Sequence, residues 1–258
     1  MNRILHSQIL GEGTPLVILH GFLGMGDNWK TLGRKFAELG YQVHLVDQRN
    51  HGRSFHDPEF DYKVMAHDLH GYLEHYGLSS VALLGHSMGG KTAMTYATLY
   101  PGQLDQLIVA DIGPKAYPLH HQDILKALNS LDFSVVRSRG EAESVIASFI
   151  KEQGTRLFLL KNLYWREKGQ LDLRINLPVL TENIEEIGME LPNESVVTTN
   201  SLFVRGANSH YIEDIDFLGI QRQFPQSQLA TIPNAGHWLH ADNPSNFFDT
   251  VVDFLPSR

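Results

Sequence analysis

The stretch "VALLGHSMGGKTAMTYATLYP", residues 81–101, joins a short apolar run to a helical pattern through the pentapeptide "GHSMG". This order of strand, G-x-S-x-G and helix is typical of a strained turn that lifts a serine hydroxyl above a sheet. The pentapeptide alone also occurs in ordinary loops that begin helices. Because both the preceding run and the following helix are present here, the stretch predicts that Ser87 is a nucleophile.

Further apolar runs along the chain predict the sheet to which this turn belongs. Runs that are apolar almost throughout are typical of parallel strands buried on both faces, and helical patterns at 28–40 and 64–77 separate the first of them. The alternation predicts an α/β fold with a doubly wound, mostly parallel sheet. The runs are "LVILH" (16–20), "VHLV" (43–46), "VALLG" (81–85), "LIVAD" (107–111), "LFVRG" (202–206) and "LATIP" (229–233).

The alternation stops between about Pro114 and Pro192, where helical patterns at 121–131 and 141–153 follow one another. We therefore expect a core formed by residues 1–113 and 193–258, with a helical lid inserted at 114–192. The lid carries an apolar cluster that can roof a pocket, although ordinary helix packing explains each member equally well. Its members are Phe158, Leu159, Leu160, Leu163, Tyr164 and Trp165.

The amino-acid composition of the chain excludes several classes of protein. The chain has 258 residues, 42% of them hydrophobic, which suits one large domain. Its formal net charge of −8 argues against nucleic acid as a partner, because phosphate backbones require clustered Lys and Arg. The chain has no cysteine, no secretory h-region and no apolar run of membrane-spanning length. We expect a soluble, cytoplasmic protein with no membrane partner; the sequence leaves its oligomeric state undefined.

A nucleophile of this kind needs donors for the oxyanion that develops on its substrate. "LHGFLG" (19–24) follows the first long apolar run, so the backbone amides of Phe22 and Met88 can form the donor pair. A glycine-rich turn after a strand is also compatible with phosphate binding, but the G-x-x-x-x-G-K-[ST] pattern is missing.

Fourteen histidines are candidates for the general base, and His237 stands out. It follows the last predicted strand, and Asn234-Ala235-Gly236 supplies a turn that can aim its ring across the carboxyl edge of the sheet. A histidine can exchange protons near neutral pH. The alternative for His237 is an exposed loop residue, and the histidines at 67, 70 and 75 lack a carboxylate-rich partner motif for a metal.

Several motifs together resemble the α/β-hydrolase superfamily and, within it, the YbfF-type esterases. The motifs are "LHGFLG", "DQRNHGRS", "GHSMGGK", "DIGP", "RGANSHY" and "NAGHWLHAD", and the resemblance covers nearly the whole chain. The acid of most members corresponds in position to Ser209. In the YbfF type that position is also serine, and the resemblance implies that the acid is Asp111.

Physical arguments agree with that assignment. Asp111 ends the apolar run at 107–111. A right-handed crossover makes this strand the neighbour of the nucleophile strand, so the Asp111 carboxylate lies at the same edge of the sheet as Ser87. A serine hydroxyl cannot stabilise an imidazolium, whereas Ser209 can donate to Asp111 and favour its charged form. The alternative for Asp111 is an aspartate in an ordinary turn. In "DQRNHGRS" (47–54) we expect a structural turn.

We expect a serine carboxylesterase that acts on a small-molecule ester, or on a thioester, without a cofactor or metal. "LHGFLGMGDNW" also resembles lyases of the menaquinone pathway, which perform elimination on this fold and need cationic groups for a dicarboxylate. A domain that only binds a ligand is the third alternative, because a fold does not establish an activity. Lys115, His120 and His121 can meet an anionic headgroup, but we expect a solvated loop there.

Overall fold

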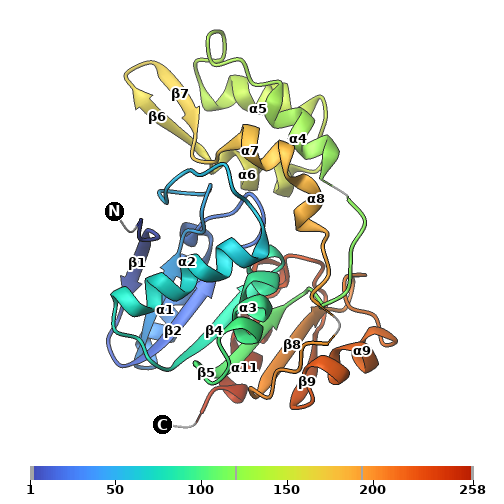
Figure 1. Ribbon diagram of the computed structural model, residues 1–258. Coiled ribbons are helices and arrows are strands. Elements are labelled where there is room, and N and C mark those ends of the chain that lie inside the picture. Colours follow the sequence, from blue (N-terminus) through green and yellow to red (C-terminus); the bar gives the residue numbers. More distant parts are fainter. Residues whose placement is uncertain (1–2, 120, 193, 257–258) are drawn as a thin grey trace.

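The computed structural model describes residues 3–119, 121–192 and 194–256 and is built on a seven-stranded sheet (Figure 1). The strand order is β1-β3-β2-β4-β5-β8-β9, and β1 alone is antiparallel to its neighbour. The mostly parallel sheet predicted from the apolar runs is therefore confirmed. The strands are β1 (Ser7–Leu10), β2 (Thr14–Leu19), β3 (Tyr41–Val46), β4 (Val81–His86), β5 (Leu104–Ala110), β8 (Ser201–Gly206) and β9 (Ser227–Ile232).

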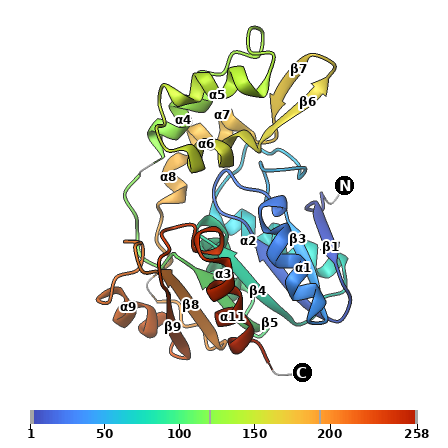
Figure 2. The ribbon, with the colours of Figure 1, turned by 180° about the vertical axis from the view of Figure 1, so that it is seen from behind.

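Helices cover both faces of the sheet, as its continuous apolar strands require (Figures 1 and 2). One face is covered by α2 (Tyr62–His75), α3 (Met88–Leu99) and α9 (Asp216–Gln223). The other is covered by the 3₁₀ helix η1 (Gly26–Trp29), α1 (Lys30–Glu38), α10 (Leu239–Asp242) and α11 (Pro244–Phe254). The predicted cap of α11 is present, since the Asn243 side chain accepts a hydrogen bond from the Asn246 amide.

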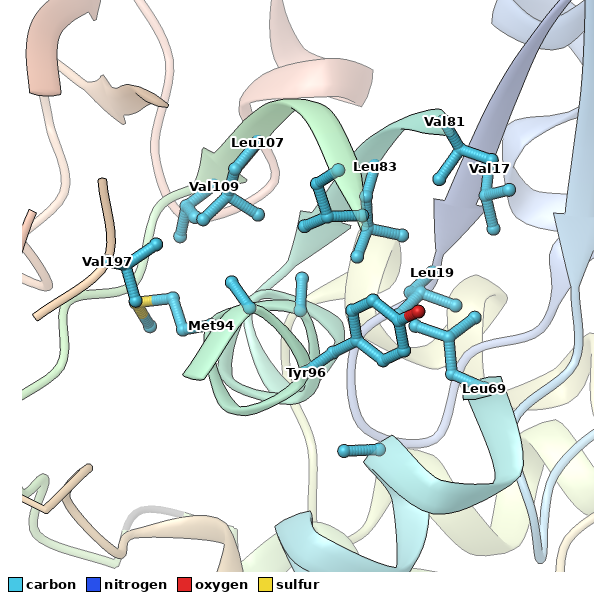
Figure 3. Close-up of a cluster of buried hydrophobic side chains, with 14 of the residues drawn as sticks. Val17, Leu19, Leu69, Val81, Leu83, Met94, Tyr96, Leu107, Val109 and Val197 are labelled. Carbon is cyan, nitrogen blue, oxygen red and sulfur yellow. The ribbon is translucent and has the colours of Figure 1, made fainter. Parts of the chain in front are cut away.

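The core beneath α2 and α3 fixes the nucleophile strand in the middle of the sheet. Val17, Leu83 and Val109 come from three neighbouring strands and face Leu69 of α2 and Met94 of α3 (Figure 3). All five side chains are at most 1% exposed. Complete burial of such a side chain contributes about 1.5–3 kcal/mol, so the end of β4 is a rigid platform.

The elements between β5 and β8 form a layer, here called the cap, above the carboxyl ends of the strands (Figure 1). Its apolar interior continues into the core through Phe22 and Met88. Besides helices it contains a β-hairpin that the sequence pattern did not predict. The cap elements are α4 (Gln122–Asn129), α5 (Arg139–Ala147), α6 (Gln153–Leu160), β6 (Leu163–Glu167), β7 (Gln170–Leu173), α7 (Leu177–Glu182) and α8 (Ile184–Ile187).

The apolar cluster expected to roof a pocket is divided in the structure. Leu159, Leu160 and Leu163 are buried inside the cap, whereas Trp165 is 52% exposed on the hairpin. Phe158 alone among the six lines the space above Ser87. Ordinary packing therefore explains most of the cluster. Within the described ranges, no helix is both long and apolar enough to cross a membrane.

Candidate active site

Ser87 occupies a strained turn between β4 and α3. Its φ of 53° and ψ of −117° are unfavourable for a residue with a side chain. The turn is held by its own amide, which donates to the Ala110 carbonyl at 3.0 Å. It is also possible only with glycine on both sides: a Cβ at Gly85 would lie 2.2 Å from the Gly89 oxygen, and one at Gly89 would lie 2.5 Å from the Leu19 oxygen. The glycines of "GHSMG" thus allow the backbone to bring Ser87 to the edge of the sheet.

The structure brings together Ser87, His237 and Asp111 from three distant parts of the chain. The Ser87 hydroxyl lies 3.0 Å from His237 Nε2, and His237 Nδ1 lies 2.8 Å from Asp111 Oδ2. Both distances are those of hydrogen bonds. The His237 side chain is 24% exposed and that of Asp111 is fully buried. The hydrogen-bonded path therefore leads from a partly exposed imidazole to a carboxylate in the protein interior.

The carboxylate of Asp111 is fixed on every side. The residue follows β5, the neighbour of β4, in a left-handed conformation with φ of 52°. Oδ1 accepts the Gly206 amide at 3.0 Å, and Oδ2 accepts both His237 Nδ1–H and the Ser209 hydroxyl. These three contacts occupy both carboxylate oxygens and fix the orientation of Asp111 beside the imidazole.

Two residues that hold His237 could not be identified from the sequence. The buried His86 donates from Nε2 to the His237 carbonyl at 2.8 Å. The Tyr211 ring stacks on the His237 ring, with centroids 3.9 Å apart and planes inclined by 16°. Both belong to quoted motifs, but only the three-dimensional structure shows their contact with the imidazole. Together they fix the loop and the plane of the ring.

Phe22, in the loop after β2, lines the same cleft as Ser87, and Met88 follows Ser87 directly as the first residue of α3. Within the described part of the chain neither amide has a protein acceptor. The loop itself is fixed by Leu23, whose amide donates to His51 Nε2 at 3.2 Å and whose carbonyl accepts from Asn162 at 2.8 Å. Since Asn162 belongs to the cap, the cap helps to position this amide pair.

Buried histidines surround the site and are neutral. Burial lowers the pKa of His20 to about 4, and burial followed by repulsion from His20 lowers the pKa of His51 to about 3. Burial likewise lowers the pKa of His240 to about 3 and holds the pKa of His86 well below its usual range. The contacts agree: His20 donates from Nδ1 to the Gly21 carbonyl and accepts the Gln48 amide at Nε2. These uncharged imidazole rings fill the buried space around the site.

The "DQRNHGRS" segment is structural, as expected. Asp47 accepts the amides of Gly26 and Arg53 at 2.7 and 2.8 Å. Arg49 is buried and forms a two-point ion pair with Asp68. Neither side chain reaches the space above Ser87.

The expectation of a solvated loop holds in part for Lys115, whose side chain is 39% exposed. Lys115 is paired with Asp216 at 2.6 Å. The expectation is wrong for His121, whose ring packs edge-on against Phe22 at 5.1 Å and lines the space above Ser87. His120 lies outside the described residues.

A cleft of about 770 Å³ lies between the cap and the nucleophile turn. Its size suits a small-molecule ligand. Ser87, His237 and Phe22 form its floor, while Phe158 of the cap and Trp238 pack together at 4.9 Å on its wall. The charged side chains on its lining are Lys161, Glu152 and Asp242. Among the described residues, no group of three or more His, Cys, Asp and Glu side chains is arranged to hold a metal.

The chain is similar to known hydrolases. Residues 14–142 match the protein family described as alpha/beta hydrolase fold. A mouse protein named sn-1-specific diacylglycerol lipase ABHD11 is 38% identical over 255 residues, which cover 95% of this chain and 82% of that protein. The esterase YbfF of Escherichia coli K12 is 33% identical over 95% of this chain and 94% of its own. The solved structure of a marine microorganism esterase is 41% identical, with a TM-score of 0.95 over 98% of this chain and all of that one.

The matches span nearly the whole chain and agree with the mostly parallel sheet and the serine turn described above. The chain is therefore a hydrolase that belongs to the α/β-hydrolase family, among the esterases that resemble YbfF.

Proposed function

We propose that this protein is a serine carboxylesterase that hydrolyses small acyl esters, and acyl thioesters, through an acyl-enzyme on Ser87. One observation carries the proposal. Ser87 Oγ, the His237 ring and the Asp111 carboxylate form an unbroken hydrogen-bonded path at 3.0 and 2.8 Å. Such a path raises the reactivity of a serine that is otherwise a weak nucleophile.

In the first half of the reaction Ser87 Oγ attacks the substrate carbonyl carbon while its proton passes to His237 Nε2. The carbonyl oxygen becomes an oxyanion, which the Phe22 and Met88 amides stabilise by donating hydrogen bonds. Asp111 stabilises the imidazolium. When the tetrahedral intermediate collapses, His237 returns the proton to the leaving oxygen or sulfur, and the acyl group remains bonded to Ser87.

In the second half water replaces the alcohol or thiol. His237 accepts a proton from water, and the resulting hydroxide attacks the acyl carbon; His237 then protonates Ser87 Oγ as the carboxylic acid leaves. Asp111 again stabilises the charged ring. The Ser209 hydroxyl supports this role by donating to Asp111 Oδ2.

The lining of the cleft favours ester hydrolysis over the elimination chemistry of the menaquinone-pathway lyases. A dicarboxylate substrate requires clustered cations. The cleft instead carries Lys161 together with the carboxylates of Glu152 and Asp242. The names of the similar mouse lipase and E. coli esterase likewise point to acyl esters.

Pre-steady-state kinetics with p-nitrophenyl acetate test the proposal. We expect a burst of p-nitrophenol equal to about one equivalent per chain when deacylation is slower than acylation. Ser87→Ala should abolish the burst and lower kcat by about 10⁶-fold. Elimination from a carboxylated substrate, with no turnover of esters or thioesters, would favour the lyase alternative; tight ligand binding without any turnover would favour a binding domain.

A further inference from the structure

Two separate spaces meet at Ser87. One is the cleft; the other, here called the side pocket, has a volume of about 20 Å³. Ser87 and Met88 form the base of the side pocket, and its walls include Tyr62, Tyr117, Leu119 and Ile187. His237 and Phe22 line the cleft instead.

The chemistry assigns a different part of an ester to each space. The carbonyl carbon bonded to Ser87 Oγ carries an oxyanion, a leaving group and an acyl chain. His237 must protonate the leaving atom, so the leaving group lies on the side of His237. His237 borders the cleft together with its neighbours Gly236 and Trp238.

The side pocket shares His121 and Tyr211 with the cleft but is not lined by His237, so it is the space that remains for the acyl chain. We propose that the side pocket is the acyl subsite and the cleft is the subsite for the alcohol or thiol. The preferred substrates are then short-chain acyl esters, acetyl above all, of large alcohols or thiols. This inference rests on the proposed acyl-enzyme function and adds the substrate class.

The size of the side pocket limits the chain. A cavity needs about 10–15 Å³ to hold one water-sized group. The observed volume of about 20 Å³ therefore admits the methyl group of an acetyl ester, and a longer chain requires the walls to move.

Hydrogen bonds hold the walls, which include residues of the two connections between core and cap, at 113–119 and 187–191. The Tyr117 amide donates to the Gly188 carbonyl and the Leu191 amide donates to the Pro114 carbonyl, both at 2.8 Å. From the core, the Tyr62 hydroxyl donates to the Ile187 carbonyl at 2.9 Å. These bonds join both connections to each other and to α2.

A buried lysine of α3 adds a further clamp. The Lys91 side chain is fully buried, and its Nζ donates to the carbonyls of Lys115 at 2.6 Å, Met189 at 2.7 Å and Pro114 at 3.3 Å. Two of these acceptors belong to the first connection and one to the second. Widening the side pocket would break these hydrogen bonds and leave backbone carbonyls without their donor, which opposes any movement of the walls.

A series of p-nitrophenyl esters with one leaving group and increasing acyl length tests the assignment. We expect kcat/KM to be highest for the acetate and to fall by at least about 10-fold for the butyrate, because each poorly fitting methylene costs about 10- to 200-fold. Leu119→Ala and Ile187→Ala should raise the ratio of butyrate to acetate by about 10-fold. Leu119 is only partly buried, so its variant keeps the test valid where Ile187→Ala does not fold.

Phe158→Ala is the matched control, since Phe158 lines the cleft and not the side pocket. It should leave the butyrate-to-acetate ratio unchanged and alter the preference among acetate esters of different alcohols. Wild-type protein that prefers octanoate, or an acyl preference that responds to Phe158→Ala and not to Leu119→Ala, would overturn the assignment.

Intact-mass measurement during turnover separates this inference from the proposed function. Acyl adducts on Ser87 with no preference for short chains would refute the subsite and leave the acyl-enzyme mechanism standing. Turnover without any adduct on Ser87, with adducts likewise missing under acid quench, would overturn both.

Discussion

Asp111→Asn removes the charge that orients and stabilises the His237 ring while keeping the shape of the side chain. An amide nitrogen facing His237 Nδ1 would donate to it, so the ring would carry its proton on Nε2 and could no longer accept the Ser87 proton. Loss of the acid in such a triad lowers kcat by about 10⁴-fold, which corresponds to about 5 kcal/mol.

The double variant Asp111→Ser, Ser209→Asp exchanges the carboxylate and the hydroxyl. It tests whether the acid can support His237 from either of the two residues. The Ser209 hydroxyl contacts Asp111 Oδ2, the same oxygen that accepts from His237 Nδ1 at 2.8 Å. An aspartate side chain reaches one bond further than serine. The carboxylate introduced by Ser209→Asp therefore reaches the ring once Asp111→Ser has removed the first one. We expect the double variant to be about 10²-fold more active than Asp111→Ser alone. On a logarithmic scale this gain is half of the about 10⁴-fold loss in kcat that removal of the acid causes.

Steady-state hydrolysis of p-nitrophenyl acetate measures both effects, and thermal unfolding verifies that each variant folds. Asp214→Asn and Asp216→Asn serve as matched controls, because these carboxylates pair with Arg205 and Lys115 outside the path to Ser87. Both should retain nearly full activity. Near-normal turnover by Asp111→Asn, or a large loss in Asp214→Asn, would refute the assignment of the acid.

Two further outcomes follow from buried groups. The pKa values of His20 and His51, lowered by burial to about 4 and about 3, mean that the unfolded chain binds more protons below pH 6.5. The free energy of unfolding should therefore fall as the pH drops below 6.5, by about 2 kcal/mol for each of the two histidines at pH 5. Equal urea midpoints at pH 7 and pH 5 would contradict this. Lys91→Met removes the donor from the carbonyls of Lys115 and Met189, while the Pro114 carbonyl keeps the Leu191 amide, and the change should lower the free energy of unfolding by about 2 kcal/mol, measured by urea unfolding. An unchanged midpoint and slope would show that these bonds contribute nothing.

The sequence predicted features whose cause is local. Five of the six parallel strands are recognisable because burial on both faces makes each run apolar, whereas β9 lies at the edge of the sheet and is mostly not buried. The serine turn is recognisable because its glycines are sterically required. β1 was missed because its four residues are only partly buried at the edge of the sheet. The β6–β7 hairpin was missed because Leu163 and its neighbours continue an apolar pattern that also fits a helix.

Features that depend on distant contacts could not be predicted from patterns. His86, Lys91 and Tyr211 stand in recognisable motifs. Their contact partners lie between 23 and 151 positions away in the sequence, so no local pattern reveals these contacts. The preference for Asp111 over Ser209 depended on the family resemblance, because both residues follow neighbouring strands. In the structure both side chains meet at one carboxylate oxygen.

Covalent labelling tests the central claim, the reactivity of Ser87, most directly. After treatment with a fluorophosphonate, mass spectrometry of the intact chain and of its peptides should reveal one adduct, located on Ser87, together with complete loss of esterase activity. The adduct should be missing in Ser87→Ala and should form much more slowly in Asp111→Asn. Protein that is fully inactivated while Ser87 remains unmodified, or that stays active with Ser87 labelled, would contradict the account.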